Sequence, residues 1–370
     1  MIAGNGLSRS WAAAVSPETN QLALRLSRQI AGFGPISVAA YMRAANAEYY
    51  NRADPLGVDG DFITAPEISQ MFGELVGMWL TDIWLRQISP PNCHYVELGP
   101  GRGTLSADAL RAMARFEFAP PVHFVETSNA LRVKQAATVP QAQFHDAIGS
   151  LPEDGPLLIV ANEFFDALPV RQLVATHSGW RERVVGRDRG TKFIAMPGAQ
   201  SMDAIVPAEF RNAGIDSIYE TAPDTSGIVD ELAARLHAQG GVLMVIDYGY
   251  AQPGLGSTLQ AVKNHQFANP FENPGDHDLT AHVNFLEMAN VARVRNLRVS
   301  GPVNQGAWLE ALGINQRAVG LADASPERSD EIFAARNRLV NDDEMGSLFK
   351  ILAISSPDWP QPEGFESTVV

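Results

Sequence analysis

The sequence predicts an α/β protein built around a parallel β-sheet with helices on both faces. Short apolar runs rich in β-branched residues follow one another after residue 93, and they alternate with segments of helical or turn character. The four runs are "HYVEL", "VHFVE", "PLLIVANEF" and "GVLMVIDYG". Strands that are apolar throughout are typical of parallel sheets that are buried on both sides.

Polar residues end these runs and predict the position of a ligand site. They are Glu97, Glu126, Asn162, Glu163 and Asp247. The carboxyl ends of parallel strands meet at one edge of a sheet, and open α/β sheets bind their ligands beyond that edge. We therefore expect these side chains to lie around one site.

The first ninety residues predict a helical extension. Residues 18–50 have a helical pattern, and Pro35 is expected to open a second helix because proline is well tolerated in a first turn. Thr64 and Glu67 have the spacing of a capping box, in which each side chain accepts from an otherwise unpaired backbone amide. Apolar residues then recur at three- and four-residue steps over residues 68–83, which indicates an amphipathic helix.

Residues 91–370 predict the main domain, with an insertion at about residues 171–235. The stretch "VRQLVATHSGWRERVVGRDRGTKFIAMPG" has the alternation and turn residues of β-hairpins. Near the end of the chain, "MGSLFKILAISSP" predicts a last strand that returns to the sheet. The chain thus divides into a helical extension over residues 1–90 and a main domain that carries inserted hairpins.

Composition restricts the possible partners. Asp and Glu number 42 against 28 Lys and Arg, a net charge of -14, which disfavours nucleic acid and anionic membranes as partners. The single Cys93 excludes an internal disulfide and a Cys-rich zinc site, and it is typical of a reducing compartment. No apolar run reaches the roughly 18 residues of a membrane span. The start, "MIAGNGLSRSWAAAV", resembles a transit peptide only weakly, and we expect an ordinary frayed N-terminus.

The stretch "YVELGPGRGTL" at residues 95–105 predicts a loop that holds a nucleotide cofactor. Glycine permits both positive φ and close approach of the backbone to a ligand. The dinucleotide fingerprint G-x-G-x-x-G fits poorly, because Gly99, Gly101 and Gly103 place the third glycine one position early. Thr104 stands where that fingerprint needs Gly or Ala, and Glu97 would repel a diphosphate. The cationic, phosphate-free S-adenosylmethionine suits this carboxylate better.

Two further acidic residues complete the expected cofactor site. Glu126 ends the second strand and can accept hydrogen bonds from both ribose hydroxyls, a feature that NAD sites share. Asp146, in "FHDAI" after a third predicted strand, could accept the adenine amino group. The alternative interpretation takes the glycines as a tight turn, Glu126 as an exposed strand end and Asp146 as a helix cap. The glycine loop combined with Glu97 and Glu126 favours the cofactor.

Five motifs give a resemblance to a known family. They are "GDFITAPEISQMFGE", "ELGPGRGTL", "NEFFDALPV", "DYGY" and "DLTAHVNF", and the resemblance extends from about residue 30 to 353. The set resembles that of the S-adenosylmethionine-dependent methyltransferases related to the mitochondrial complex I assembly-factor arginine methyltransferase, a family with bacterial members. The resemblance implies a Rossmann-like methyltransferase sheet with an N-terminal helical extension and inserted β-hairpins.

The resemblance also implies a function. In the mitochondrial relatives the reaction is methylation of an arginine on a complex I subunit, so the expected partner is a protein substrate of this or a similar kind. By the same resemblance, Gly99, Gly101, Gly103 and Glu126 are cofactor residues, since each matches its motif. The expected location is the bacterial cytoplasm or, alternatively, the mitochondrial matrix.

The methyl acceptor is expected to bind at "NEFFDALP". Carboxylates that grip a guanidinium can localise the lone pair on its attacking nitrogen, and Glu163 and Asp166 lie just past a strand end. Arginine methyltransferases in general use an acidic pair at a similar place, and Phe164 and Phe165 would form walls. The alternative makes Glu163 a cap and the phenylalanines core residues. Asn162 with Phe165 also resembles the N-P-P-Y pattern of amide and amino-base methyltransferases, although the prolines are missing, so an amide acceptor stays open.

Other motif residues are expected near the acceptor. The motif "GDHDLTAHVNF" contains two histidines and two aspartates, but it lacks a recognisable metal spacing, and we expect no metal. Asp278 is expected to cap a helix that begins near Leu279, and His282 to face the acceptor pocket as a proton acceptor. Gln70 and Phe72 are expected to line the pocket, because the resemblance places their helix over the cofactor.

Two functions of other classes stay open. An NAD-dependent oxidoreductase would share the glycine loop, but the early third glycine and Glu97 count against it. A non-enzymatic assembly chaperone would keep the cofactor fold as a relic and use the apolar helix with Met71, Phe72 and Trp79 as a partner groove. The intact glycines and strand-end acids argue against a relic. The sequence does not indicate an oligomeric state.

Overall fold

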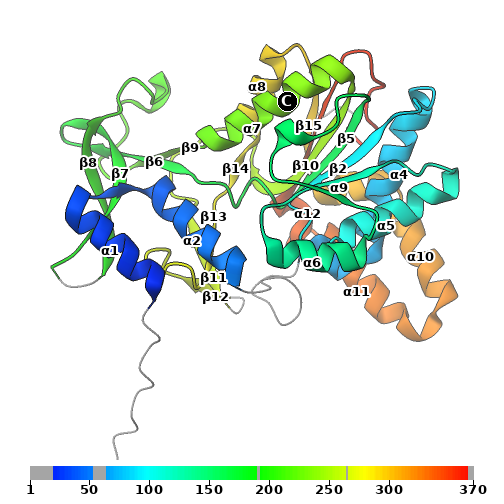
Figure 1. The fold of residues 1–370 in the computed structure, drawn as a ribbon, viewed down its shortest axis with the longest axis horizontal. Helices are drawn as coiled ribbons and strands as arrows, with labels where there is room; N and C mark the ends of the chain where they lie inside the picture. Colours follow the sequence, from blue (N-terminus) through cyan, green and yellow to red (C-terminus); the bar gives the residue numbers. More distant parts are fainter. Residues whose placement is uncertain (1–19, 53–63, 190–191, 264–265, 366–370) are drawn as a thin grey trace, which may run out of the picture.

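The computed structural model describes residues 20–52, 64–189, 192–263 and 266–365. Its central layer is an eight-stranded sheet in the order β15-β16-β10-β5-β2-β3-β4, with β14 paired to β10 (Figure 1). The strands are β2 (His94–Leu98), β3 (Val122–Val125), β4 (Gln143–His145), β5 (Leu157–Asn162), β10 (Gly241–Tyr250), β14 (Val283–Asn284), β15 (Arg298–Asn304) and β16 (Phe349–Ser355). Strands β4, β3, β2, β5 and β10 run parallel, and β16 lies antiparallel between β10 and β15. The predicted parallel sheet and the returning last strand are confirmed.

Helices cover both faces of this sheet, as its apolar strands predict. On one face, Tyr95 and Leu158 pack into a core with α4, α5 and the C-terminal helices, and on the other, Val96 and Ile159 pack with α7 and α8. The helices are α4 (Gln70–Arg86), α5 (Thr104–Met113), α6 (Asn129–Thr138), α7 (Pro223–Gln239), α8 (Phe285–Val294), α9 (Gln305–Ala311), α10 (Ile314–Ala324), α11 (Ser329–Val340) and α12 (Met345–Leu348). Among the described residues, none of the helices combines the length and apolar character that crossing a bilayer requires.

Helix α4 packs closely against α5, the helix that follows the glycine loop, because two glycines of α4 lie at the contact. A Cβ atom added at Gly77 would lie 2.4 Å from the carbonyl oxygen of Ala109, and one at Gly73 would lie 2.7 Å from Cβ of Asp108. Only glycine allows this approach at the two positions. The apolar side of α4 therefore faces the core between α5 and the sheet, and Phe72 is fully buried there.

A second lobe lies beside the carboxyl ends of the strands, on the left in Figure 1. It combines α1 (Gln21–Phe33) and α2 (Val38–Arg52) with a five-stranded and a three-stranded sheet, and its core joins Leu22, Tyr41, Val185 and Leu279. Its strands are β1 (Ile36–Ser37), β6 (Arg171–Thr176), β7 (Gly179–Arg187), β8 (Phe193–Ser201), β9 (Ile218–Thr221), β11 (Gln260–Lys263), β12 (Gln266–Ala268) and β13 (Asp278–Thr280).

The predicted hairpins are present as the antiparallel pairs β6–β7 and β7–β8. The N-terminal helices separate, however: α1 and α2 pack on the inserted strands, whereas α4 packs on the central sheet. The inserted sheet ends with β9 at Thr221, and α7 returns to the central sheet.

Three local predictions are wrong. In each case the residue makes a contact with a distant part of the chain in place of the predicted local one. The chain after Pro35 enters β1, which pairs with β7, and α2 begins only at Val38. Thr64 precedes the short helix α3 (Ala65–Ile68) without a side-chain cap, because the carboxylate of Glu67 instead accepts a hydrogen bond from the Thr104 hydroxyl at 2.6 Å. Asp278 begins strand β13, and α8 is capped by Asn284.

A row of three histidines crosses β2, β3 and β4 and predicts an acid-sensitive fold. His94 Nδ1 lies 3.1 Å from His123 Nε2, His123 Nδ1 lies 3.0 Å from His145 Nε2, and Asp154 Oδ1 lies 3.0 Å from His94 Nε2. Burial, together with the neighbouring His94 and His145 rings, lowers the pKa of His123 to about 4. The unfolded chain, whose histidines titrate near 6.5, therefore binds the extra proton first as the pH falls.

The free energy of unfolding should decrease as the pH falls from about 6.5 to about 4, by up to about 1.4 kcal/mol per pH unit from this group. Urea denaturation at a series of pH values measures the slope, and His123→Gln should flatten it. His177→Gln, in an exposed turn, is the control and should leave the slope unchanged. An unchanged slope in His123→Gln would exclude His123 as its source.

Candidate active site

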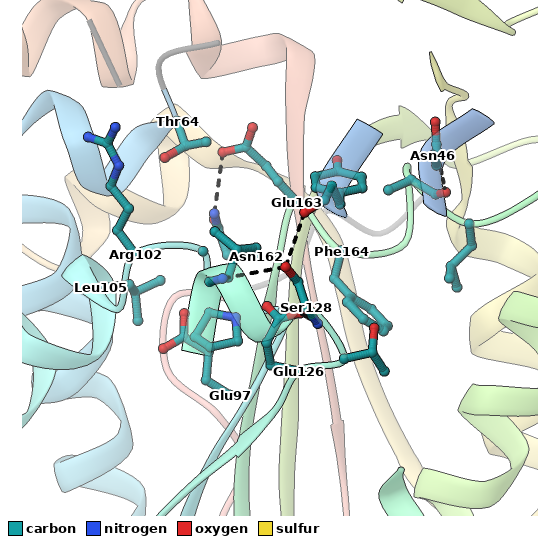
Figure 2. Close-up of a pocket in the computed structure, with 18 of the residues that line it drawn as sticks. Asn46, Thr64, Glu97, Arg102, Leu105, Glu126, Ser128, Asn162, Glu163 and Phe164 are labelled. Carbon is teal, nitrogen blue, oxygen red and sulfur yellow. Dashed lines mark hydrogen bonds between the residues drawn. The ribbon is translucent and has the colours of Figure 1, made fainter. Parts of the chain in front are cut away.

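A cavity of about 510 Å³ opens at the carboxyl ends of β2, β3 and β5, where the second lobe meets the central sheet. The side chains that line it come from α2, from α3, from the glycine loop and from the segments after β3 and β5. Figure 2 shows Glu97, Glu126, Asn162 and Glu163 around this space, with Asn46 of α2 on one side and Arg102 of the glycine loop on the other. Four of the five strand-end residues line the cavity, whereas Asp247 does not, because it accepts hydrogen bonds from the backbone N–H groups of Phe165 and Asp166 behind it.

The glycine loop takes a backbone conformation that requires glycine. The φ angles are 59° at Gly99, 55° at Gly101 and 82° at Gly103, all in the left-handed region. A Cβ atom at Gly99 would also lie 2.9 Å from the ring of Phe164. Gly99 and Gly101 line the cavity, and Gly103 is the N-cap residue of α5. The loop therefore offers bare backbone to a ligand, as predicted.

Glu97 places a buried carboxyl group beneath this loop. It accepts hydrogen bonds from the hydroxyl groups of Ser106 and Tyr95, the latter at 3.2 Å. Burial raises the pKa of Glu97 to about 7, and the two hydroxyl donors lower it in part. A cation in the cavity would favour the ionised form, whereas a diphosphate would oppose it.

Glu126 is held in a fixed orientation at the end of β3. Its Oε1 accepts from the backbone N–H of Ser128 at 2.7 Å, and its Oε2 accepts from the Gln135 amide at 3.0 Å. The same Gln135 amide donates to the carbonyl oxygen of Gly101 at 2.8 Å, so it ties the carboxylate to the glycine loop. Each carboxylate oxygen keeps a second lone pair, which fits a vicinal pair of ribose hydroxyls.

Asp146 does not line the cavity, contrary to the prediction of an adenine contact. Its side chain is 86% exposed and pairs with Arg132 of α6 at 2.6 Å. The Arg132 guanidinium also donates to the backbone carbonyl oxygens of Glu126 and His145, so it fixes Asp146 against the outside of the site.

Glu163 and Asn162 occupy the cavity at the end of β5. Glu163 has a left-handed φ of 49°, which turns a non-glycine residue out of the strand. Burial raises the pKa of Glu163 to about 8, and the charge of Asp166 adds to the rise. The backbone N–H of Ala65 and the Asn162 amide approach its Oε1 at 3.4 and 3.3 Å and act in the opposite direction. The buried Oδ1 of Asn162 has no hydrogen-bond partner among the described residues.

Asp166 lies behind this site rather than in it, so the predicted acidic pair does not face the cavity. Its Oδ2 accepts from the Tyr248 hydroxyl at 2.6 Å, and its backbone N–H donates to Asp247 at 3.2 Å. Phe165 is buried in the core between the sheet and helices α7 and α8. Of the two phenylalanines, Phe164 lines the cavity. The N-P-P-Y-like interpretation loses its aromatic member for the same reason.

The remaining predicted acceptor residues also lie elsewhere. His282 lines a separate small cavity with Phe165 and Glu287. Gln70 is exposed beside Glu74, and Phe72 is fully buried, because α4 turns its apolar side to the core. In the part of the chain that the structure describes, no group of three His, Cys, Asp or Glu side chains is arranged to hold a metal ion.

One wall of the cavity was not predicted from the sequence. Residues of α2 form it, namely Arg43, Asn46, Ala47, Tyr50 and Asn51, and Thr64, Pro66 and Glu67 add to it at the start of α3. Polar side chains recur in "MRAANAEYYN" at three- and four-residue steps, so the sequence does indicate that one face of this helix is polar. The sequence pattern does not indicate where that face lies relative to the sheet.

The fold and the cavity together define a class of protein. Strands β4, β3, β2, β5 and β10 repeat the 3-2-1-4-5 order of nucleotide-binding sheets, but the antiparallel β16 lies next to β10 in place of a sixth parallel strand. The glycine turn, the ribose-type carboxylate Glu126 and the buried Glu97 fit a nucleoside cofactor with a positive centre. This is the site of an S-adenosylmethionine-dependent methyltransferase.

Comparison with known proteins agrees with this class. A family model for S-adenosyl-L-methionine-dependent methyltransferases matches residues 75–303. The mitochondrial protein arginine methyltransferase NDUFAF7 homolog of Drosophila melanogaster is 35% identical, over 90% of this chain and 84% of its own length. The mitochondrial protein arginine methyltransferase NDUFAF7 of Mus musculus is 33% identical, over 92% of this chain and 86% of its own.

Among solved structures, that of a protein from Burkholderia thailandensis bound to S-adenosyl-homocysteine matches with a TM-score of 0.81. It is 25% identical and covers 94% of both chains. The chain belongs to the family of S-adenosylmethionine-dependent methyltransferases that includes these NDUFAF7 relatives. S-adenosylmethionine is its cofactor, and the oxidoreductase interpretation is set aside.

Proposed function

We propose that the chain transfers a methyl group from S-adenosylmethionine to a nitrogen of an arginine guanidinium in a protein substrate. The observation that carries the proposal is the buried carboxyl of Glu163 at the cavity end of β5, beside the Oδ1 of Asn162, which has no hydrogen-bond partner in the described part of the chain. Both groups accept hydrogen bonds, and a guanidinium presents N–H donors in a planar fork. The relatives named as protein arginine methyltransferases support the same acceptor.

The residues of the chain would act on the acceptor in two ways. Ionised Glu163 would hold the guanidinium by its charge, and Asn162 Oδ1 would accept from a second nitrogen and fix the plane of the group. The bound donor supplies a methyl group on a sulfonium centre, from which methyl transfer leaves a neutral thioether. The attacking nitrogen gives up one proton when it gains the methyl group, and Glu163 is placed to accept that proton.

The partner and the compartment belong to the same proposal. The resemblance gives a respiratory complex I subunit, or a similar protein, as the substrate. It also gives the bacterial cytoplasm or the mitochondrial matrix as the location, and the relatives cited above are named as mitochondrial.

Incubation with a methyl-labelled donor and a lysate of the source organism tests the proposal. Mass spectrometry of the labelled protein should find methylarginine. Label on glutamine, on another side chain or on a small molecule would contradict the proposed acceptor, and it would leave the methyltransferase class intact.

The rate at low concentrations of donor and acceptor should rise with pH and level off above about 8. Glu163 must be ionised to accept a proton, and its pKa of about 8 leaves it mostly protonated at neutral pH. Below 8 the rate should change about tenfold per pH unit. The acceptor cannot cause this rise, because a free arginine side chain stays charged throughout the range.

Saturation with donor should move the rise to lower pH, because the sulfonium charge favours the carboxylate. Initial rates from pH 6 to 9 measure both profiles, and the residual rate of Glu163→Gln at saturating donor should not show the rise, because the ionisation of Glu97, whose pKa is about 7, then no longer limits donor binding. A flat profile for the unchanged protein would remove Glu163 as the titrating group.

A further inference from the structure

Helix α2 separates two kinds of side chain. One side of the helix, including Tyr41, Met42 and Ala45, is buried in the core of the second lobe. The side that lines the cavity carries Asn46 and Tyr50 together with the exposed Ala47. The cofactor loop and Glu126 come from β2 and β3 of the other lobe, so α2 forms the wall that these cofactor residues leave open.

Asn46 attaches this wall to the segment that carries Glu163. Its Nδ2 donates to the carbonyl oxygen of Ala167 at 3.0 Å and to that of Leu279 at 2.7 Å, and its Oδ1 accepts from the N–H of Leu279 at 3.1 Å. The side chain is buried, with 6% of the residue exposed. Ala167 lies in the segment that follows Glu163. The side-chain amide of Asn46 therefore fixes α2 both to this segment and to β13.

A second attachment joins α2 to the cofactor half of the site. The Ser128 hydroxyl donates to the carbonyl oxygen of Tyr50 at 3.0 Å, and the Ser128 backbone N–H holds Glu126. The Tyr50 hydroxyl donates to Asp278 at 2.9 Å. The loss of Asn46 would therefore remove the hydrogen bonds that fix α2 to the segment after Glu163 and leave its contact with the cofactor half in place.

We propose that α2 is the acceptor-binding wall of the cavity and that Asn46 is a positioning residue, which sets the distance between this wall and Glu163. The inference rests on the proposed transfer to a protein side chain. An acceptor nitrogen must be aligned with the methyl group to react, and a misplacement of about 1 Å can cost on the order of 100-fold in rate. The loops after β2 and β3 bind the donor, so a displacement of α2 would misplace the acceptor and leave the donor in position.

The test compares Asn46→Ala with the unchanged protein. The rate constant kcat divided by the acceptor KM should fall by about 100-fold, with a rise in acceptor KM. The affinity for S-adenosylhomocysteine in calorimetry should change by less than about threefold, which is under 1 kcal/mol. Asn20→Ala is the matched control, because Asn20 caps α1 and donates to the carbonyl oxygen of Pro274 in the same lobe, away from the cavity. It should lower Tm without changing the acceptor KM.

Ala47→Leu keeps the test decisive if Asn46→Ala does not fold. Ala47 is exposed toward the cavity, so a larger side chain there should leave Tm unchanged and raise the acceptor KM at least about tenfold, while the donor affinity stays constant. Acceptor kinetics that stay normal in both variants would overturn the proposal, and so would an equal loss of donor and acceptor binding. If the unchanged protein methylates no arginine at all, the proposed function fails instead, which is a separate outcome.

Discussion

Gly101→Val is expected to abolish S-adenosylmethionine binding. The φ of 55° at Gly101 lies in the left-handed region, where a residue with a side chain costs about 1–2 kcal/mol and a β-branched one more. The backbone must then move or the new methyl groups must enter the cavity that Gly101 lines. Because the strain is present with and without the ligand, the affinity falls through the filled or displaced ligand space, and we expect a loss on the order of 100-fold or more, which is about 2.7 kcal/mol.

Calorimetry with S-adenosylhomocysteine measures this loss, and circular dichroism melting shows whether the fold persists. Gly313→Val is the matched control, because Gly313 has a φ of 91° and a Cβ there would approach only Gln316, at 3.4 Å. The control should lose stability through the same strain and keep its affinity for the cofactor. Unaltered affinity in Gly101→Val would show that the loop does not contact the ligand.

Glu163→Gln is expected to lose turnover and to keep cofactor binding. The substitution keeps the shape of the side chain and removes both the charge that holds a guanidinium and the group that accepts its proton. A positioned base contributes about 10²- to 10⁴-fold to a rate, so kcat should fall within that range, as measured with a labelled methyl donor. Donor affinity should stay within about threefold, because the glycine loop and Glu126 belong to other strands.

Asp166→Asn tests whether Glu163 acts alone or as one of a pair of catalytic carboxylates. Asp166 does not line the cavity, but its charge raises the pKa of Glu163. The removal of that charge should retain turnover at high pH and move the pH rise to lower values. If Asp166→Asn instead lost turnover as completely as Glu163→Gln, the acidic-pair interpretation would be restored. Full activity in Glu163→Gln would remove Glu163 from the chemistry.

The central sheet and the cofactor half of the site were predictable from local sequence patterns. Strands β2 and β5 are apolar apart from His94, Glu97 and Asn162, as a doubly covered sheet requires, and this pattern can be read from neighbouring residues alone. The glycine turn is local as well, because three glycines within five residues permit the positive φ that all three adopt. Glu97, Glu126, Asn162 and Glu163 followed from these elements, since a strand end fixes the position of the residues next to it.

Which side chains face the acceptor depends on how the helices and the sheet pack, and local patterns do not contain that information. Phe72 and Phe165 have apolar side chains that suit either a pocket wall or a core, and the packing of α4 and of the central sheet assigned both to the core. Asp146 lost its predicted role to an ion pair with Arg132 of α6.

Asn46 reached the cavity because β1 pairs with β7 and the core of the second lobe carries α2 across the strand ends. The physical reason is the range of the interactions. Backbone conformation and apolar periodicity depend on neighbours along the chain, whereas the position of one lobe against another depends on contacts between residues more than a hundred positions apart.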